Sequence, residues 1–231
     1  MNEILIVPDI HGRNFWEPAL DYDGEVIFLG DYTDPYPHEH FTSEDAYRNL
    51  LKIISYKQQN PDRVTLLTGN HELHYYNREF AASRFSSKYY EKYHAILTDD
   101  ATAGLFQICK QIDKYLFIHA GITKSWYDLH KDELQRLGTH LEDQVNNLFT
   151  SNMEAFFEIS GYRGGFHRAG SPLWADIHEL FGEEESFDHE MIQVIGHTQI
   201  ADDEPFIEGN IRLLDNRQLY VLKAHEIKKY T

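Results

Sequence analysis

Five short apolar runs constrain the fold more than any other feature of the sequence, because each of them leads into a polar residue of the kind that binds ligands. The runs with their polar ends read ILIVPDIHG from Ile4, VIFLGDYTD from Val26, VTLLTGNHE from Val64, YLFIHAG from Tyr115 and VIGHT from Val194. A short apolar run bounded by turn residues is typical of a strand that is buried on both faces of a sheet. Ligand sites of layered α/β proteins lie beyond the carboxyl ends of such strands. We therefore predict an α/β fold with a site built at these strand ends.

The polar residues at these junctions are of the types that bind divalent metals or transfer protons. They are Asp9, His11, Asp31, Asn70, His71, His119 and His197. Oxygen and imidazole ligands without sulfur suit Mn, Fe, Zn or Mg. Two such ions roughly 3.5–4 Å apart can activate a hydroxide for phosphoryl transfer. The spacing of Asp9 and His11 lets one loop offer both groups to one metal, whereas His71, next to Asn70, points a different way and could act on the substrate.

The segments between the runs are mostly helical in pattern. Ser43 is a suitable N-cap for a helix that ends before Pro61, which gives strand–helix–strand order and predicts parallel pairing of the flanking strands. A short helix is expected over 15–20, and the loop 32–41 contains two prolines and should lack regular structure. Further helical patterns cover 84–97, 105–112 and 123–159.

The C-terminal third is less regular. The glycine-rich stretch 161–174 ends the helical pattern, and the acidic run 183–185 is most simply a solvated loop. Two strand candidates, 211–214 and 218–222, are joined at Asn216 and Arg217, which suggests a closing antiparallel hairpin.

Length, charge and cysteine content limit the class of protein. The 231 residues contain no linker rich in Pro, Gly or Ser, which predicts a single domain over 1–231. A formal net charge of −17 argues against a nucleic-acid partner, but bound divalent cations would still allow a phosphorylated substrate. Cys109 is the only cysteine, so no internal disulfide forms. With neither a signal peptide nor a membrane span recognisable, we expect a cytoplasmic protein without a membrane partner.

The ordered set PDIHG, GDYTD, GNHE, HAG and GHT resembles the calcineurin-like metallophosphoesterases. It is most similar to their phosphoprotein phosphatase branch, whose signature is GDxHG, GDxxDRG and GNHE. Gln199 stands where other branches place another metal-binding His in GHxH, which favours the phosphatase branch. The resemblance implies two mixed β-sheets packed as a sandwich flanked by helices, in a four-layer α/β/β/α fold.

The resemblance also implies roles for individual residues. The first of two metal ions is held by Asp9, His11 and Asp31, and Asp31 bridges to the second, which is completed by Asn70, His119 and His197. His71, oriented by Asp34, resembles the general acid for the leaving oxygen, and a metal-bridging hydroxide attacks phosphorus without a phosphoenzyme. Manganese is the favoured metal, with Fe or Zn as alternatives.

One departure from the family pattern concerns phosphate binding. The branch follows the second Asp of GDxxDRG with an Arg that grips phosphate, but here Asp34 is followed by Pro35, which cannot donate a hydrogen bond. Another arginine is therefore expected to bind phosphate, and the candidates are Arg13, Arg163 and Arg168, of which Arg168 is favoured.

We therefore expect a metal-dependent phosphatase that hydrolyses phosphomonoesters, with a phosphoserine or phosphothreonine protein as the substrate partner, or a small phosphoester. The alternative enzyme is a nucleotide or dinucleoside polyphosphate hydrolase of the same superfamily. A non-catalytic scaffold is the alternative from another class, but it would be expected to lose ligands, and none of the six is lost.

Overall fold

The computed structural model describes residues 3–181, 187–188 and 190–231. The chain forms two compact units, of which the first comprises residues 1–107 and 216–231 and the second comprises residues 108–215. Each unit contains one β-sheet.

The sheet of the first unit has six strands in the order β11-β10-β1-β2-β3-β4. The bounds are β1 Ile4–Val7, β2 Glu25–Phe28, β3 Val64–Leu67, β4 Phe106–Gln107, β10 Tyr220–Lys223 and β11 Glu226–Lys229. Neighbours from β1 to β4 pair in parallel, whereas β10 is antiparallel to both β1 and β11. Three of the five apolar runs thus form β1, β2 and β3, and the sheet is mixed.

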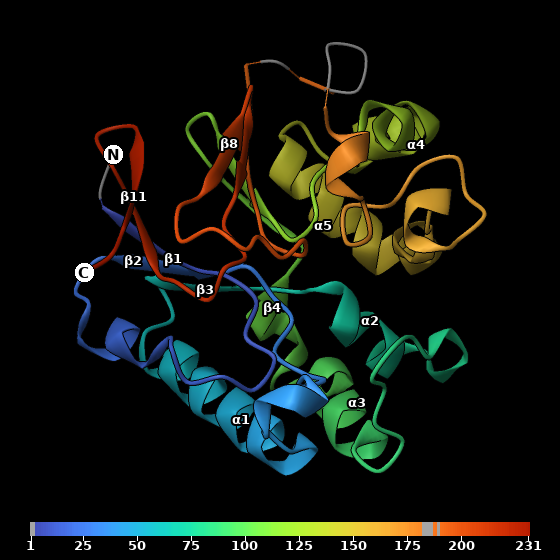
Figure 1. Ribbon diagram of the computed structural model, residues 1–231. Coiled ribbons are helices and arrows are strands. Elements are labelled where there is room, and N and C mark those ends of the chain that lie inside the picture. The colour runs from blue at the N-terminus through green and yellow to red at the C-terminus, as the bar shows by residue number, and fades with distance from the viewer. Residues whose placement is uncertain (1–2, 182–186, 189) are drawn as a thin grey trace. The chain divides into compact units, whose positions relative to one another are not determined.

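The helices of the first unit place its loops. Helix α1 (Ser43–Gln59) connects β2 to β3, followed by α2 (Asn70–Tyr76) and α3 (Tyr90–Thr98). Figure 1 shows α1 and α3 on the same face of the sheet, where their apolar residues share one core cluster with strand residues such as Phe28 and Leu66. Short 3-10 helices occupy Glu17–Asp21, Pro37–Glu39, Arg78–Phe80 and Ala103–Leu105. The parallel pairing predicted across α1 is confirmed.

The second unit has a five-stranded sheet in the order β5-β6-β7-β9-β8. The bounds are β5 Cys109–Ile112, β6 Tyr115–Ile118, β7 Ile192–Ile195, β8 Phe206–Glu208 and β9 Ile211–Leu213. The central strands β6, β7 and β9 are parallel, and the two edge strands are antiparallel to them. Helices α4 (Lys124–Leu137) and α5 (Leu141–Ser151) pack against each other, and 3-10 helices occupy Met153–Phe157, Gly161–Arg163 and Ile177–Glu179.

Several local predictions are wrong. The strands at 211–213 and 220–223 form no hairpin, because β9 pairs with β7 and β8 while β10 pairs with β1. Residues 106–107 and 109–112 are strands rather than helix, since β4 and β5 each complete a sheet edge. The N-cap of α1 is Thr42, whose side chain accepts from Asp45 N, and not Ser43. The loop 32–41 includes one 3-10 turn.

The helix predicted over 84–97 is shorter than expected. It begins only at Tyr90, because Arg84 has a φ of 65° and the backbone N–H of Ser86 donates to the Tyr75 hydroxyl instead of a helical carbonyl. The acidic run 183–185 lies outside the described residues.

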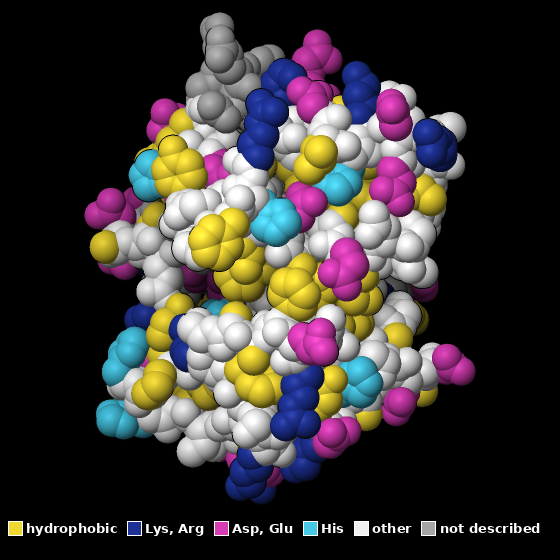
Figure 2. Space-filling view, turned by 90° about the vertical axis from the view of Figure 1, so that its right-hand side faces the viewer, with side chains coloured by type: hydrophobic (Ala, Val, Ile, Leu, Met, Phe, Trp, Pro, Cys, Tyr) yellow, Lys and Arg dark blue, Asp and Glu magenta, His cyan; other side chains and the backbone are white. Residues whose placement is uncertain are grey.

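The prediction of an α/β fold with two mixed sheets and flanking helices is confirmed. A single domain over 1–231 and the sandwich of the two sheets stay predictions. Among the described residues, no helix is long and apolar enough to cross a membrane. Figure 2 shows Asp, Glu, Lys and Arg side chains scattered over the face that it presents.

Candidate active site

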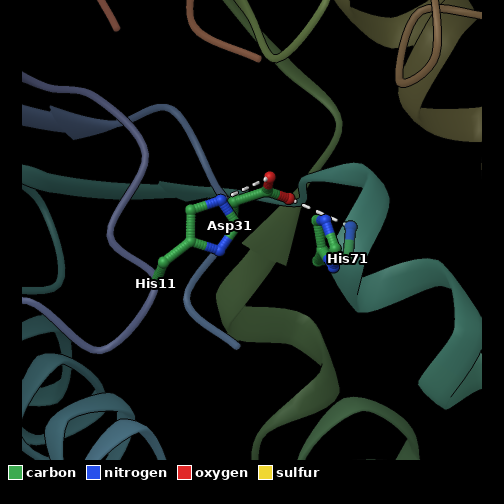
Figure 3. A group of neighbouring side chains, drawn as sticks. All are labelled: His11, Asp31 and His71. Atoms are coloured by element: carbon green, nitrogen blue, oxygen red, sulfur yellow. Dashed lines mark hydrogen bonds and ion pairs between the residues drawn. The ribbon is translucent and has the colours of Figure 1, made fainter. Parts of the chain in front are cut away.

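Asp31 lies between His11 and His71 in the first unit, and all three side chains are buried (Figure 3). They come from the segments that follow β1, β2 and β3, which are neighbours in the sheet. One carboxylate oxygen of Asp31 is 3.3 Å from Nε2 of His11, and the other accepts the backbone N–H of His71 at 3.0 Å. The carboxyl ends of three parallel strands thus bring the predicted groups together.

The backbone at this point is strained. His11 has a φ of 45° and Asp31 a φ of 54°, which residues other than glycine rarely adopt. The backbone N–H of His11 donates to the carbonyl of Asp31 at 2.6 Å, which joins the two turns. A Cβ at Gly69 would lie 2.2 Å from Oδ1 of Asp31, so glycine is required for α2 to begin this close. Such strain is typical of functional sites.

Glu72 holds the turn that carries Asp31. Its fully buried carboxylate accepts the backbone N–H groups of Gly69, Asp31, Tyr32 and Thr33 at 2.9 to 3.2 Å, and also the Thr33 hydroxyl at 3.0 Å. The motif GNHE by itself predicts no separate role for Glu72. Its role is to fix the start of α2 to the end of β2.

Asp34 receives three side-chain hydrogen bonds. His71 Nδ1 lies 2.9 Å and His74 Nε2 2.5 Å from Oδ2, and the Tyr75 hydroxyl donates to Oδ1 at 2.5 Å. Burial raises the pKa of Asp34, but the hydrogen bonds and charges of His71 and His74 outweigh it and hold that pKa below its usual value. The predicted pairing of Asp34 with His71 is thus present, and His74 and Tyr75 are additional partners that the sequence analysis missed.

The two histidines around Asp31 have opposite pKa shifts. Burial dominates at His11 and lowers its pKa, because Asp31 compensates only in part. Burial also lowers the pKa of His71, but the charge of Asp31 and the hydrogen bond to Asp34 outweigh it, and the net pKa is raised. A neutral His11 keeps a nitrogen lone pair for a metal, whereas His71 is suited to carry a proton.

Arg84 is a residue near His71 that the sequence analysis missed. Its Nη2 is 2.7 Å from Nε2 of His71, and its Cζ lies 3.6 Å from the centroid of the Tyr36 ring. The helical pattern over 84–97 gave no signal for this contact.

In the second unit, His119 and His197 lie together. They follow the parallel neighbours β6 and β7, and Nε2 of His119 is 3.2 Å from Nδ1 of His197. The backbone N–H of Gly196 donates to the carbonyl of His119 at 2.9 Å, and His197 has a φ of 66°. The last two of the five junctions therefore present two imidazoles at one place.

The remaining predicted residues differ in burial and in their partners. Asp9 is buried after β1, and Asn70 is the buried first residue of α2. Arg13 is buried and donates to both carboxylate oxygens of Glu39 at 2.6 and 3.1 Å. In the second unit, Arg163 lies 2.8 Å from Asp176 and Arg168 is exposed.

These donor sets fit divalent cations. Around Asp31, a ring nitrogen of His11 and a carboxylate oxygen of Asp31 lie within 4.8 Å of each other, and both residues are buried. In the second unit, His119 and His197 add two imidazole nitrogens. Buried carboxylate and imidazole groups without thiolate suit Mn, Fe or Zn.

Comparison with known families decides the class of protein. The family model described as calcineurin-like phosphoesterase matches residues 3–200. The chain belongs to this family. The resemblance of the five motifs to this family is confirmed.

Two curated relatives are serine/threonine phosphatases by name. The chain is 30% identical over 203 residues to a probable serine/threonine-protein phosphatase of Encephalitozoon cuniculi, covering 80% of this chain and 41% of that protein. It is 30% identical over 133 residues to the serine/threonine-protein phosphatase 4 catalytic subunit of Saccharomyces cerevisiae, covering 55% and 38%. The chain thus spans about two fifths of the length of these relatives.

Solved structures support the fold. A cold-active protein-tyrosine phosphatase of a psychrophilic Shewanella species aligns with a TM-score of 0.65 at 16% identity, covering 99% of this chain and 77% of that one. A protein serine/threonine phosphatase from Saccharomyces cerevisiae aligns with a TM-score of 0.57, also at 16% identity, covering 99% and 79%. At this identity, the likeness applies to the fold alone.

Proposed function

We propose that the chain is a metal-dependent phosphatase that hydrolyses phosphomonoesters, with phosphoserine and phosphothreonine proteins as its substrate class. The observation that carries the proposal is the buried Asp34–His71 pair beside Asp31, in a chain of this family. The names of the curated relatives support the choice of serine and threonine esters. The cytoplasmic location expected from the sequence stays a prediction.

The proposal includes two cations, with manganese favoured over iron and zinc. Asp9, His11 and Asp31 would hold the first, and the assignment of Asp31, Asn70, His119 and His197 to the second stays a prediction from the sequence motifs. When bound, such cations lower the pKa of a coordinated water and neutralise charge on the phosphate. Asp31 is suited to sharing because its two carboxylate oxygens are directed at different partners.

His71 would act on the leaving group. The Asp34 carboxylate accepts a hydrogen bond from Nδ1 of His71 and so fixes the orientation of the imidazole ring. In this orientation Nε2 is directed away from the carboxylate. A protonated Nε2 can then donate its proton to the ester oxygen as the phosphorus–oxygen bond breaks and water adds to phosphorus. The leaving alcohol takes that proton, which removes the need to expel an alkoxide.

A substrate panel tests the proposal. The purified protein, loaded with Mn²⁺, would be assayed with phosphoserine, phosphothreonine and phosphotyrosine peptides and with dinucleoside polyphosphates. Release of phosphate from the serine and threonine peptides with the highest kcat/KM is expected. Preferred cleavage of dinucleoside polyphosphates would support the alternative hydrolase, and no turnover of any ester would favour the non-catalytic scaffold.

A further inference from the structure

The Arg84 guanidinium lies at the proposed site without an acidic partner. Nη2 donates to Nε2 of His71 at 2.7 Å, yet Arg84 forms no ion pair with any carboxylate of the described residues. Its Nε is buried and has no hydrogen-bond partner in the part of the chain that the structure describes. A guanidinium has five N–H donors in a planar fork that matches the oxygens of a phosphate. Most of these donors are left for another group.

The loop that carries Arg84 is held by the partners of Asp34. The backbone N–H of Ala82 donates to Nδ1 of His74 at 3.2 Å, and that of Ser86 donates to the Tyr75 hydroxyl at 3.0 Å. His74 and Tyr75 in turn both contact Asp34. The carboxylate that orients His71 therefore also fixes both ends of the Arg84 loop.

Arg84 itself has a strained backbone. Its φ of 65° lies in the left-handed region, where a long side chain is uncommon. Such strain persists only where the surrounding contacts enforce it, and it gathers at ligand sites. Here the hydrogen bonds of Ala82 and Ser86 on either side enforce it.

Tyr36 provides a surface for the guanidinium. Cζ of Arg84 lies 3.6 Å from the Tyr36 ring centroid, and the same ring makes a T-shaped contact with the His11 ring, with centroids 5.0 Å apart. An aromatic face holds the guanidinium plane and leaves its edge donors available. Tyr36 follows Pro35, so the segment that lacks the arginine of the family pattern contributes this platform instead.

We propose that Arg84, stacked on Tyr36, binds the substrate phosphate in place of an arginine after Asp34. The phosphate oxygens would accept from Nε and the Nη groups, and the contact of Nη2 with Nε2 of His71 would be exchanged for these bonds. His71 Nε2 would then face the ester oxygen. This inference rests on the proposed phosphatase function, and it assigns the phosphate contact to the first unit rather than to Arg163 or Arg168.

The test compares variants of the Mn²⁺-loaded protein. Arg84→Asn removes the guanidinium, and Asn tolerates the left-handed backbone. It should lower kcat/KM by about 10–100-fold, the loss of one charged hydrogen-bonding group. It should also weaken inhibition by inorganic phosphate, and Arg84→Lys should give an intermediate loss because it keeps charge without the planar fork. The exposed Arg78, six positions earlier in the chain, is the matched control, and Arg78→Ala should match the wild type.

A second pair of variants tests the platform. Tyr36→Phe keeps the ring and should retain phosphate inhibition, whereas Tyr36→Leu removes the aromatic face and should weaken it. Thermal melts of every variant identify those that no longer fold. If Arg84→Asn or Tyr36→Leu does not fold, phosphate inhibition of the conservative variants Arg84→Lys and Tyr36→Phe is compared with that of the wild type instead.

The outcomes separate this inference from the function on which it rests. A wild type without phosphatase activity would overturn the proposed function itself. An active wild type with unchanged kcat/KM and phosphate inhibition in Arg84→Asn would overturn the inference alone, as would a loss confined to Arg163→Ala or Arg168→Ala. If Arg84 only positioned His71, Arg84→Asn would slow alkyl esters more than aryl esters and leave phosphate inhibition unchanged, which would also contradict it.

Discussion

At the scale of single residues, Asp31 has a position that few other residue types could fill. It is buried, has a positive φ, and directs its two carboxylate oxygens at different partners. An amide has one acceptor oxygen and no charge, so asparagine could not offer a carboxylate oxygen to each of two cations.

We therefore expect Asp31→Asn to abolish turnover and to reduce the metal bound by the purified protein. Metal content by mass spectrometry and activity with an aryl phosphate measure both effects. The exposed Asp21 is the control, and Asp21→Asn should behave as wild type. Full metal content with normal turnover in Asp31→Asn would contradict the shared-ligand role.

The role of His71 predicts a dependence on the leaving group. General acid catalysis is worth about 10²–10⁴-fold and matters most for poor leaving groups. His71→Asn should therefore slow an alkyl phosphate much more than an activated aryl phosphate, with bound metal retained. Equal slowing of the two esters would exclude proton donation by His71.

Some of these site residues can be predicted from the sequence and others cannot, for a physical reason. Asp31 and His71 follow recognisable strands, and parallel strands deliver their ends to one edge of a sheet. His74 and Tyr75 reach Asp34 only because α2 begins at Asn70, which local pattern does not specify. Arg84 approaches His71 because hydrogen bonds join Ala82 and Ser86 to side chains of α2, and no short pattern encodes these.

At the scale of elements, Glu72 joins α2 to the turn after β2. It is fully buried and accepts from four backbone N–H groups and one hydroxyl. A carboxylate can satisfy this many donors because both of its oxygens only accept.

Glu72→Gln should destabilise the protein by about 2–5 kcal/mol, because its NH₂ group would face N–H donors and leave them unpaired inside. Urea denaturation gives the change in free energy of unfolding. Glu79→Gln, at an exposed position in the 3-10 helix Arg78–Phe80, should change this free energy little. A Glu72→Gln variant as stable as wild type would show that the turn does not depend on this carboxylate.

Strand partners were harder to predict than strands. The apolar runs identified β1, β2, β3, β6 and β7 because buried strands are locally apolar. The tail was misread because Asn216 and Arg217 look like a hairpin turn, yet the strands on either side of them belong to different sheets. Pairing of β10 with β1 joins residues that are far apart in sequence, and turn chemistry carries no information about it.

At the scale of the whole molecule, the net charge of −17 opposes the compact state. The acidic side chains are scattered on the face shown in Figure 2. The effect of salt on the repulsion between these charges should therefore be separable from the effect of a cation bound at Asp31.

Raising NaCl from about 10 to about 150 mM should raise the Tm, because screening shortens the Debye length from about 30 to about 8 Å. MnCl₂ at matched ionic strength should raise it further, since a ligand that binds only the folded state adds about 2.7 kcal/mol at 100 times its Kd. Asp31→Asn should keep the NaCl response and lose the additional Mn²⁺ response. Identical melting curves of the wild type in the two salts would contradict a folded-state cation site.

The place of β10 in the first sheet has a consequence for the order in which the protein matures during synthesis. The strands β1, β2 and β3, whose ends carry Asp9, Asp31 and Asn70, leave the ribosome before β10 does. The neighbour that covers β1 is made only after all of the second unit. Until then β1 is an apolar edge strand with unpaired backbone N–H and C=O groups, and it can pair with the wrong partner. The newborn chain therefore carries its ligand residues on a sheet that is not yet closed, and a cation captured at that stage would bind an unfinished site.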